Sequence, residues 1–197
     1  MMFATLYVPN FYLQAALRHR GPDILPESQS GATPAPSDKI HETRLPRPVA
    51  LIDEQEKKPV IMQLNAQAEA AGVRQGMTPS QGLARCLSLF ITTRSALQET
   101  SVQEILLHQA FTLTPYVEAT GPGLCTVQFT DTRNLVSKVS HVIAQLAVCQ
   151  VMAQAGLGPA PDTSFLAAHL ARPVLQIDDA QNFLAPLPIE ILGLEWD

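Results

Sequence analysis

Short apolar runs alternate along the chain with segments in which apolar residues recur at helical spacing. The apolar runs predict strands at 4–8, 49–53, 60–65, 89–92, 117–119, 124–129, 150–157 and 174–177. The helical spacing predicts helices at 11–20, 65–72, from 79 onward, at 95–113, 134–147 and 162–171, with helical turns at 180–185 and 188–192. Elements in this order indicate an α+β protein.

Several residues mark where these helices begin and end. Thr78 can cap the helix that starts at Pro79, and Asp162 is expected to cap a later helix. Gly72 stands just past an alanine-rich helix, where a left-handed residue is favoured. The segment 21–45 is rich in Pro, Ser and Gly and can bury little apolar surface, so it is expected to be a flexible insertion.

Composition places the chain among folded globular proteins. Of its 197 residues, 46% are hydrophobic and 16% are charged. Its longest apolar run is far shorter than the roughly 20 residues that span a bilayer, so no membrane contact is expected. The N-terminus has neither the positively charged segment nor the small-residue cleavage site of a secretory signal, and a cytoplasmic protein is expected.

The net charge of −5 is distributed unevenly. Residues 1–100 contain ten Lys and Arg against nine Asp and Glu, a sum of +1, whereas residues 101–197 contain three against nine, a sum of −6. A domain that holds DNA by itself needs a basic surface to neutralise phosphates. The sequence shows no such stripe, so any DNA contact is expected to be weak or shared with another domain.

The cysteines and histidines do not indicate a metal site. Cys86, Cys125 and Cys149 are widely spaced in apolar surroundings and form no Cys-x-x-Cys pair, which favours buried free thiols. The five histidines stand singly, without a His-Glu-x-x-His motif. A zinc site is therefore not expected.

Five short sequence segments, in collinear order over nearly the whole chain, resemble segments of the Y-family translesion DNA polymerases and especially of their divergent ImuB branch. They are L-Y-V-P-N-F-Y at 6–12, N-A-Q-A-E-A-A-G-V-R-Q-G-M-T-P-S-Q-G-L-A-R-C at 65–86, V-E-A-T-G-P-G-L at 117–124, G-L-G-P at 156–159 and F-L-A-P-L-P-I-E-I-L at 183–192. The segment at 65–86 is the most specific of them.

The resemblance implies a ferredoxin-like palm, an antiparallel or mixed sheet with helices on one face, built from 1–20 and 93–175. A small fingers subdomain at 46–92 would be inserted into it, and 176–197 would begin a thumb. In such polymerases three carboxylates hold two Mg²⁺ ions, because hard cations need anionic oxygen ligands. One carboxylate ends the first strand, and an adjacent Asp-Glu pair lies on the hairpin after the long helix.

None of these positions carries an acid in this sequence. The first falls on Pro9, and the Asp-Glu pair falls on Gly123 and Leu124. Without anions, two cations about 4 Å apart would repel each other unopposed, so no Mg²⁺ and no other cofactor is expected. In the fingers, Ala66 and Glu69 replace the Tyr and Arg with which the family holds the triphosphate, and Glu repels phosphate. No catalytic or metal-binding residue is therefore expected.

Some residues near these positions allow more than one interpretation. Gly123 by itself would also be explained as an ordinary turn glycine. Phe11 and Tyr12 stand where the family places the aromatic side chains that screen the sugar, although aromatic residues after a strand are more often part of the core. Glu118 and Asp131 are the acids near the hairpin, and they would be the ligands if a metal site used displaced positions.

Three functional hypotheses follow from the sequence. The first is a non-catalytic polymerase-like accessory subunit of translesion synthesis and DNA repair, acting as a scaffold in the damage-induced SOS response. Its partners would be other translesion polymerase subunits, the sliding clamp and, weakly, DNA. The second is an active Y-family nucleotidyltransferase with displaced acids. The third is an unrelated ferredoxin-like binding module, in which the segment at 65–86 would not form a two-helix lobe.

Overall fold

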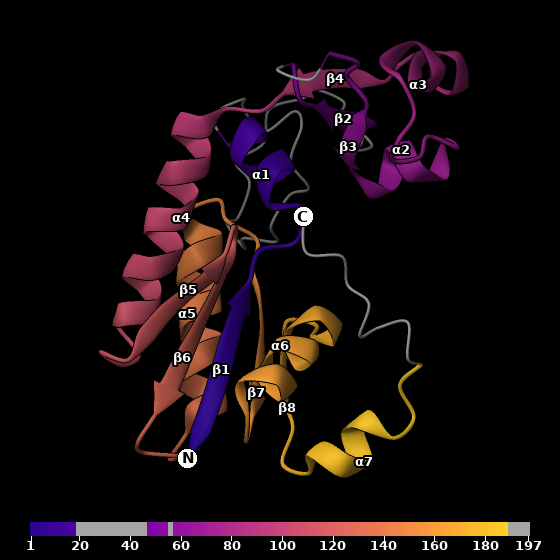
Figure 1. Cartoon of the computed structure of the whole chain (residues 1–197). Coiled ribbons are helices and arrows are strands. Elements are labelled where there is room, and N and C mark those ends of the chain that lie inside the picture. Colours follow the sequence, from indigo (N-terminus) through magenta and orange to yellow (C-terminus); the bar gives the residue numbers. More distant parts are fainter. Residues whose placement is uncertain (19–46, 55–56, 189–197) are drawn as a thin grey trace, which may run out of the picture. The chain divides into compact units, whose positions relative to one another are not determined.

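The computed structural model of the chain describes residues 1–18, 47–54 and 57–188 (Figure 1). The chain divides into two compact units: residues 1–9 with 103–197 form the first, and residues 10–102 form the second. The predicted insertion at 21–45 and almost all of the predicted turn at 188–192 lie outside the described residues. The division into palm, fingers and thumb stays a prediction.

A five-stranded mixed sheet forms the framework of the first unit (Figure 1). Its strands are β1 (Met2–Tyr7), β5 (Val117–Gly121), β6 (Leu124–Phe129), β7 (Gln154–Gly158) and β8 (Val174–Gln176). They lie in the order β5-β6-β1-β7-β8, with β1 antiparallel to both of its neighbours and β8 parallel to β7. The strands β5, β6, β1 and β7 have the order of a ferredoxin-like sheet, to which β8 adds an edge strand.

The residues of β1 alternate between the two faces of the sheet. Ala4, Leu6 and, after the strand, Val8 are fully buried on one face. Cys125 and Val127 of β6, opposite Leu6 and Ala4, continue this apolar layer. The layer is covered by α5 (Leu135–Val148), which lies behind the strands in Figure 1 and buries one apolar face of its own: Leu135, Val139, Val142, Ile143 and Leu146. These residues form the core of the first unit, as the helical spacing predicts.

The helix α6 (Pro161–Leu170) packs on the opposite face, against β7 and β1. Gly156 makes this close approach possible, because a Cβ at this position would overlap the α6 backbone at Ser164 and Ala168. Thr5, the partner of Gly156 in the ladder, shares a hydrogen bond of 2.8 Å between its hydroxyl and that of Ser164. The predicted α+β class with a mixed sheet is confirmed, and α6 adds a helix on the face that the prediction left open.

Two predicted boundaries are wrong. The strand predicted at 150–157 begins only at Gln154, because Gln150 takes a left-handed conformation (φ 60°) that ends the preceding helix. Asp162 does not cap α6. The helix begins directly after Ala160, since the proline that follows suits the first helical position, and Asp162 therefore lies within the first turn.

The second unit contains a three-stranded sheet with helices on both faces. Its elements are α1 (Phe11–Leu17), β2 (Val49–Ile52), β3 (Ile61–Leu64), α2 (Ala66–Ala70), α3 (Pro79–Arg85) and β4 (Phe90–Thr93). β2 lies in the centre, antiparallel to β3 and parallel to β4, so the predicted hairpin is confirmed. Val49 and Leu51 of β2 pack in one cluster with apolar residues of α1, whereas Ala50 and Ile52 pack in another with Ala68 of α2.

The helix signals predicted in this unit are confirmed. Thr78 caps α3 in a reciprocal arrangement with Gln81, in which each side chain accepts a bond from the backbone N–H of the other. Asn65 caps α2, and its side-chain oxygen also accepts a bond from Val49 N (3.0 Å), which ties α2 to β2. Gly72 follows α2 with a φ of 84°.

The remaining helices connect or follow these elements. α4 (Ala96–Phe111), with 16 residues, carries the chain from the second unit into the first. α7 (Ala180–Leu184) is a short helix whose first N–H groups bond to the side chain of Asp179, and it matches the turn predicted at 180–185. Within the described ranges, no helix combines the length and the apolarity that crossing a bilayer requires.

The substitution Gly156→Ala is expected to lower the free energy of unfolding by about 3 kcal/mol, because the new methyl group would meet helix backbone that cannot move aside. Gly121→Ala is the matched control, since the nearest atom to its added Cβ is Leu124 Cδ1 at 3.6 Å. Chemical denaturation of both variants measures the difference. Equal unfolding free energies would contradict the close packing of α6 on β7.

Candidate functional site

The turn between β5 and β6 lies beside the end of β1. Val8 N donates to the Gly123 carbonyl oxygen (2.8 Å), and Gly123 N donates to Oε1 of Gln103 in α4 (2.8 Å). In the ladder Tyr7 stands opposite Leu124, so their side chains lie on the same face of the sheet. The structure therefore brings Gly123 and Leu124 to the end of the first strand, which is the arrangement that the family metal site would use.

Pro9 stands outside this ladder. β1 ends at Tyr7, and Pro9 follows two residues later in a turn. The residue that ends the strand and faces Leu124 is therefore Tyr7, which the sequence analysis did not select. Strand register decides this position, and no local motif in the first strand signals it.

The conformation of Gly123 explains why a glycine stands there. Gly121 pairs with Leu124, which leaves Pro122 and Gly123 as a two-residue turn. The φ of Gly123 is 69°, as at the third position of a type II turn, where proline commonly precedes glycine. The geometry thus supports the interpretation of Gly123 as a turn glycine, and this turn offers no side chain to a cation.

An aromatic stack covers the end of β1. The ring of Tyr7 stacks on that of His169 in α6, with 4.1 Å between the ring centroids and 26° between the planes. Phe165, one helical turn earlier, lies 4.4 Å from the same imidazole, and its carbonyl oxygen is 3.0 Å from His169 Nδ1. Burial raises the pKa of Tyr7, so its hydroxyl is neutral at physiological pH. Aromatic rings therefore occupy the place at which a metal site would need a carboxylate.

His169 is a further residue that the sequence analysis missed. The sequence shows it only as one of five scattered histidines. Its spacing of four from Phe165 places both rings on one side of a helix, which is the local signal that could have pointed to a cluster. The partner Tyr7, however, is 162 positions away in the chain, and only the fold brings it to His169.

The two acids near the hairpin lie too far apart to share a pair of ions. Glu118 stands opposite Thr126. Asp131 lies beyond the other end of β6, separated from Thr126 by at least three strand residues, or roughly 10 Å. There a hydrogen bond from Arg133 Nε (3.1 Å) lowers the pKa of Asp131. Two-metal sites hold ions about 4 Å apart. In the part of the chain that the structure describes, no three His, Cys, Asp or Glu side chains are grouped so that they could hold a metal.

α2 carries the two positions that the sequence analysis associates with the triphosphate. Ala66 is the first residue of α2, Glu69 lies one turn later, and both are exposed. Arg74 Nη1 donates to the backbone oxygens of Glu69 (2.6 Å) and Val73 (2.9 Å). The helix therefore presents a methyl group and a carboxylate, neither of which can donate a hydrogen bond to phosphate.

Arg94 joins three elements of the second unit. Its guanidinium donates two bonds to the carboxylate of Glu99 (2.8 and 3.0 Å) and one to Asp53 (3.3 Å). It also lies 4.2 Å from the ring centroid of Tyr12. The hydrogen bond with Glu99 is the main cause that raises the pKa of Arg94 above its ordinary value. Phe11, which precedes Tyr12 in α1, is only 6% exposed, and this supports the interpretation of Phe11 as a core residue.

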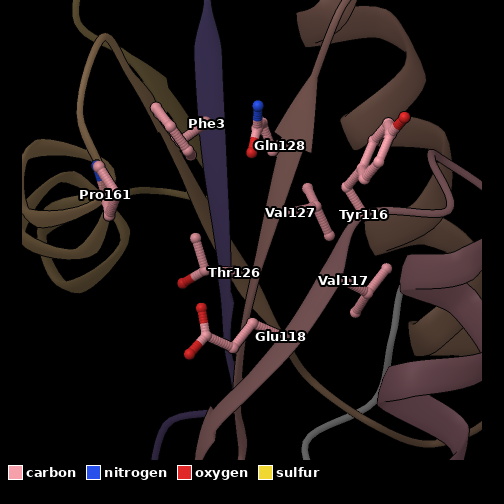
Figure 2. A pocket seen from close by; sticks show the side chains of 8 residues that line it. All are labelled: Phe3, Tyr116, Val117, Glu118, Thr126, Val127, Gln128 and Pro161. Carbon is pink, nitrogen blue, oxygen red and sulfur yellow. The ribbon is translucent and has the colours of Figure 1, made fainter.

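An open pocket of about 250 Å³ lies on the face of the sheet that carries Tyr7 (Figure 2). Its lining residues come from β1, the β5–β6 hairpin and the start of α6: Phe3, Tyr116, Val117, Glu118, Thr126, Val127, Gln128 and Pro161. Figure 2 shows the carboxylate of Glu118 and the hydroxyl of Thr126 on the same side of the strands, as their pairing requires. Among the described residues that line the pocket, Glu118 is the one with a charged side chain.

Comparison with known proteins gives a family and a fold. Residues 39–168 match the impB/mucB/samB family. Similar solved structures are the insertion ternary complex of the Dbh DNA polymerase (TM-score 0.74, 12% identity), its post-insertion binary complex (0.75, 13%) and DinB from Sulfolobus solfataricus (0.71, 12%). Each of the three matches covers 97% of this chain and 53% of the chain in the solved structure. This chain therefore spans about half the length of these proteins. No curated protein matches the sequence.

The variant Tyr7→Phe is expected to keep the stack and to change only the response to alkaline pH. Because burial raises the pKa of Tyr7 in the folded chain, the unfolded chain loses this proton first, and the free energy of unfolding falls as the pH rises above about 10. The variant should lose part of that decrease, whereas Tyr116→Phe, at an exposed side chain, should retain it. Urea unfolding at pH values from about 8 to 11 measures both. An unchanged pH slope in Tyr7→Phe would contradict the burial of this hydroxyl.

The variant Arg94→Lys is expected to lower the free energy of unfolding by about 1 kcal/mol, because lysine cannot reproduce the fork on Glu99 while covering the ring of Tyr12. Arg133→Lys is the control, since the Arg133 side chain is 87% exposed in its pair with Asp131. Thermal unfolding compares the two variants with the unmodified chain. An equal effect at both sites would show that Arg94 contributes no more than a surface ion pair.

Proposed function

The chain belongs to the impB/mucB/samB family, and from this premise we propose that it is a non-catalytic, polymerase-like accessory protein of translesion DNA synthesis, of the ImuB type. It acts as a scaffold in damage-induced mutagenesis and DNA repair. Its contacts are with other translesion polymerase subunits, with the sliding clamp and, weakly, with DNA. The third hypothesis, an unrelated ferredoxin-like module, is wrong, because the family match spans most of the chain and α2 and α3 form within residues 65–86.

The neutral end of β1 is the observation that carries the proposal. Tyr7, Gly123 and Leu124 meet there and supply a phenol, a hydrogen and an aliphatic group. Two divalent cations about 4 Å apart repel each other by roughly 16 kcal/mol at an effective dielectric constant near 20. Carboxylates must offset this repulsion in a two-metal site, and these three residues cannot. The residues present therefore do not fit the magnesium pair of the family.

The second unit supports the same conclusion from different residues. Ala66 and Glu69 stand exposed on α2, at the positions where the family holds a triphosphate. A carboxylate there repels phosphate instead of donating to it. The α2 positions and the end of β1 lie in different units, so the two observations support the proposal independently of each other.

The charge balance is consistent with an accessory role in which another protein supplies most of the DNA binding. Residues 101–197 sum to −6, and residues 1–100 sum to +1. Tight binding of nucleic acid normally requires several contacts between cationic side chains and phosphates. The DNA contact of this chain is therefore weak, and protein contacts supply most of the interaction energy of the scaffold.

Primer extension with the full-length protein and Mg²⁺ tests the proposal. No nucleotide incorporation above background is expected from the unmodified protein. A variant that combines Gly123→Asp and Leu124→Glu with either Tyr7→Asp or Pro9→Asp is also expected to be inactive, because Ala66 and Glu69 still reject the triphosphate. Calorimetric titration with a Mg²⁺–nucleotide complex should show no binding to any of these proteins.

Incorporation by the unmodified protein would overturn the proposal in favour of an active polymerase with displaced acids. In that case Glu118→Gln should abolish the activity, because Glu118 is the carboxylate in the open pocket on this face of the sheet. Asp131→Asn is the matched control, since Asp131 lies beyond the far end of β6 and is paired with Arg133.

A further inference from the structure

The geometry points to the pocket beside β5 as a docking site for an extended, basic segment of a partner protein, with a Lys or Arg side chain placed against Glu118. We infer this from the edge position of β5, the shape and lining of the pocket, and the charge of the unit. The inference deepens the proposed scaffold function and rests on it, because it assigns a surface of this portion to a protein partner.

β5 can accept an added strand along its outer side. It is the first strand in the order β5-β6-β1-β7-β8, so among the described residues one of its sides has no strand beside it. Gln128 N donates to the Tyr116 carbonyl oxygen, which turns the peptide groups of Tyr116 toward β6. Because these directions alternate along an antiparallel strand, the N–H and C=O groups of Val117 point away from β6, toward the unpaired side of β5. An irregularity after Glu118 limits the regular edge to the stretch around Tyr116–Glu118. The occupant is therefore a short extended segment.

The pocket provides a place for one long side chain of that segment. A residue added opposite Glu118 would direct its side chain to the same face as Glu118 and Thr126, where the pocket opens (Figure 2). Phe3 and Pro161 offer apolar surface to the methylene groups of a Lys or Arg, while Glu118 faces its charge. Among the described residues, Glu118 forms no ion pair within 4.0 Å that would compete with such a cation.

The charge of the first unit favours a basic partner over nucleic acid at this site. Its described residues include three cationic side chains, Arg133, Lys138 and Arg172. They include six acidic ones, Glu104, Glu118, Asp131, Asp162, Asp178 and Asp179. Three minus six leaves −3, and the only charge in the pocket lining is negative. Such a surface attracts a cationic segment and repels phosphate.

Fluorescence anisotropy with labelled synthetic peptides tests the inference on the full chain. The probe is an extended peptide of alternating valine and threonine with one central lysine, and its counterpart carries glutamate in place of that lysine. The lysine peptide is expected to bind at least about tenfold more tightly, because like charges opposed at the site are unfavourable. Glu118→Gln should weaken the lysine peptide about two- to fivefold, as for a partly exposed ion pair. Glu104→Gln, in the same unit but outside the pocket, should leave it unchanged.

Amide chemical shifts locate the bound peptide, with changes expected at Tyr116, Glu118 and Thr126. Equal binding of the two peptides, no binding up to the solubility limit, or an unchanged affinity in Glu118→Gln would overturn the inference. So would a single-stranded oligonucleotide that shifts these amides when the lysine peptide does not. The peptide assay does not depend on DNA synthesis, so a failure here is distinguishable from nucleotide incorporation, which would overturn the proposed function instead.

Discussion

The register of β1 is the constraint on which the first unit depends. This strand pairs with β6 on one side and β7 on the other, so its alternation decides what both faces of the sheet present. Ala4 and Leu6 enter the apolar layer under α5, whereas Thr5 and Tyr7 meet α6. A shift by one residue would exchange these two sets and place a hydroxyl and a phenol in the core.

This register also decides the chemistry at the end of the strand. In a metal site, carboxylates gathered at one place need cations, because like charges that share a site otherwise destabilise each other. Here the same place is stabilised without ions. The ring of Tyr7 stacks on His169, and the Gly123 turn is held by bonds to Val8 N and to the side chain of Gln103. These contacts join protein groups directly, so the packing at the end of β1 does not require a bound nucleotide or magnesium ion.

In the second unit, the contacts that hold the fold and the exposed groups of α2 are likewise different sets of residues. Arg94 links Asp53, Glu99 and Tyr12, and the alternate residues of β2 fill a cluster on each face of the small sheet. The exposed face of α2, by contrast, carries the carboxylate of Glu69, which would repel a phosphate group. Folds are conserved by their cores, whereas functions depend on a few exposed groups that can change without loss of stability. A polymerase fold at 12% identity is therefore no argument for polymerase chemistry in this chain.

Local sequence signals were enough to predict most of the helices and strands, apart from the start of β7 and the cap of α6. The hydrophobic spacing of α5, the cap at Thr78 and the hairpin of β2 and β3 are signals within a few residues of one another, so they could be predicted locally. The placement of Gly123 and Leu124 beside the first strand was also predicted, through the resemblance to the family.

Long-range contacts were needed to learn that Tyr7 ends β1 opposite Leu124, that the His169 ring covers it, and that α6 packs on this face. Tyr7 and Leu124 are 117 positions apart, and Tyr7 and His169 are 162 apart. Their contacts depend on strand register and on the close approach that Gly156 permits, neither of which leaves a periodic pattern in the sequence. The local pattern can say that a strand and a helix exist, but long-range pairing decides which of their side chains share a site.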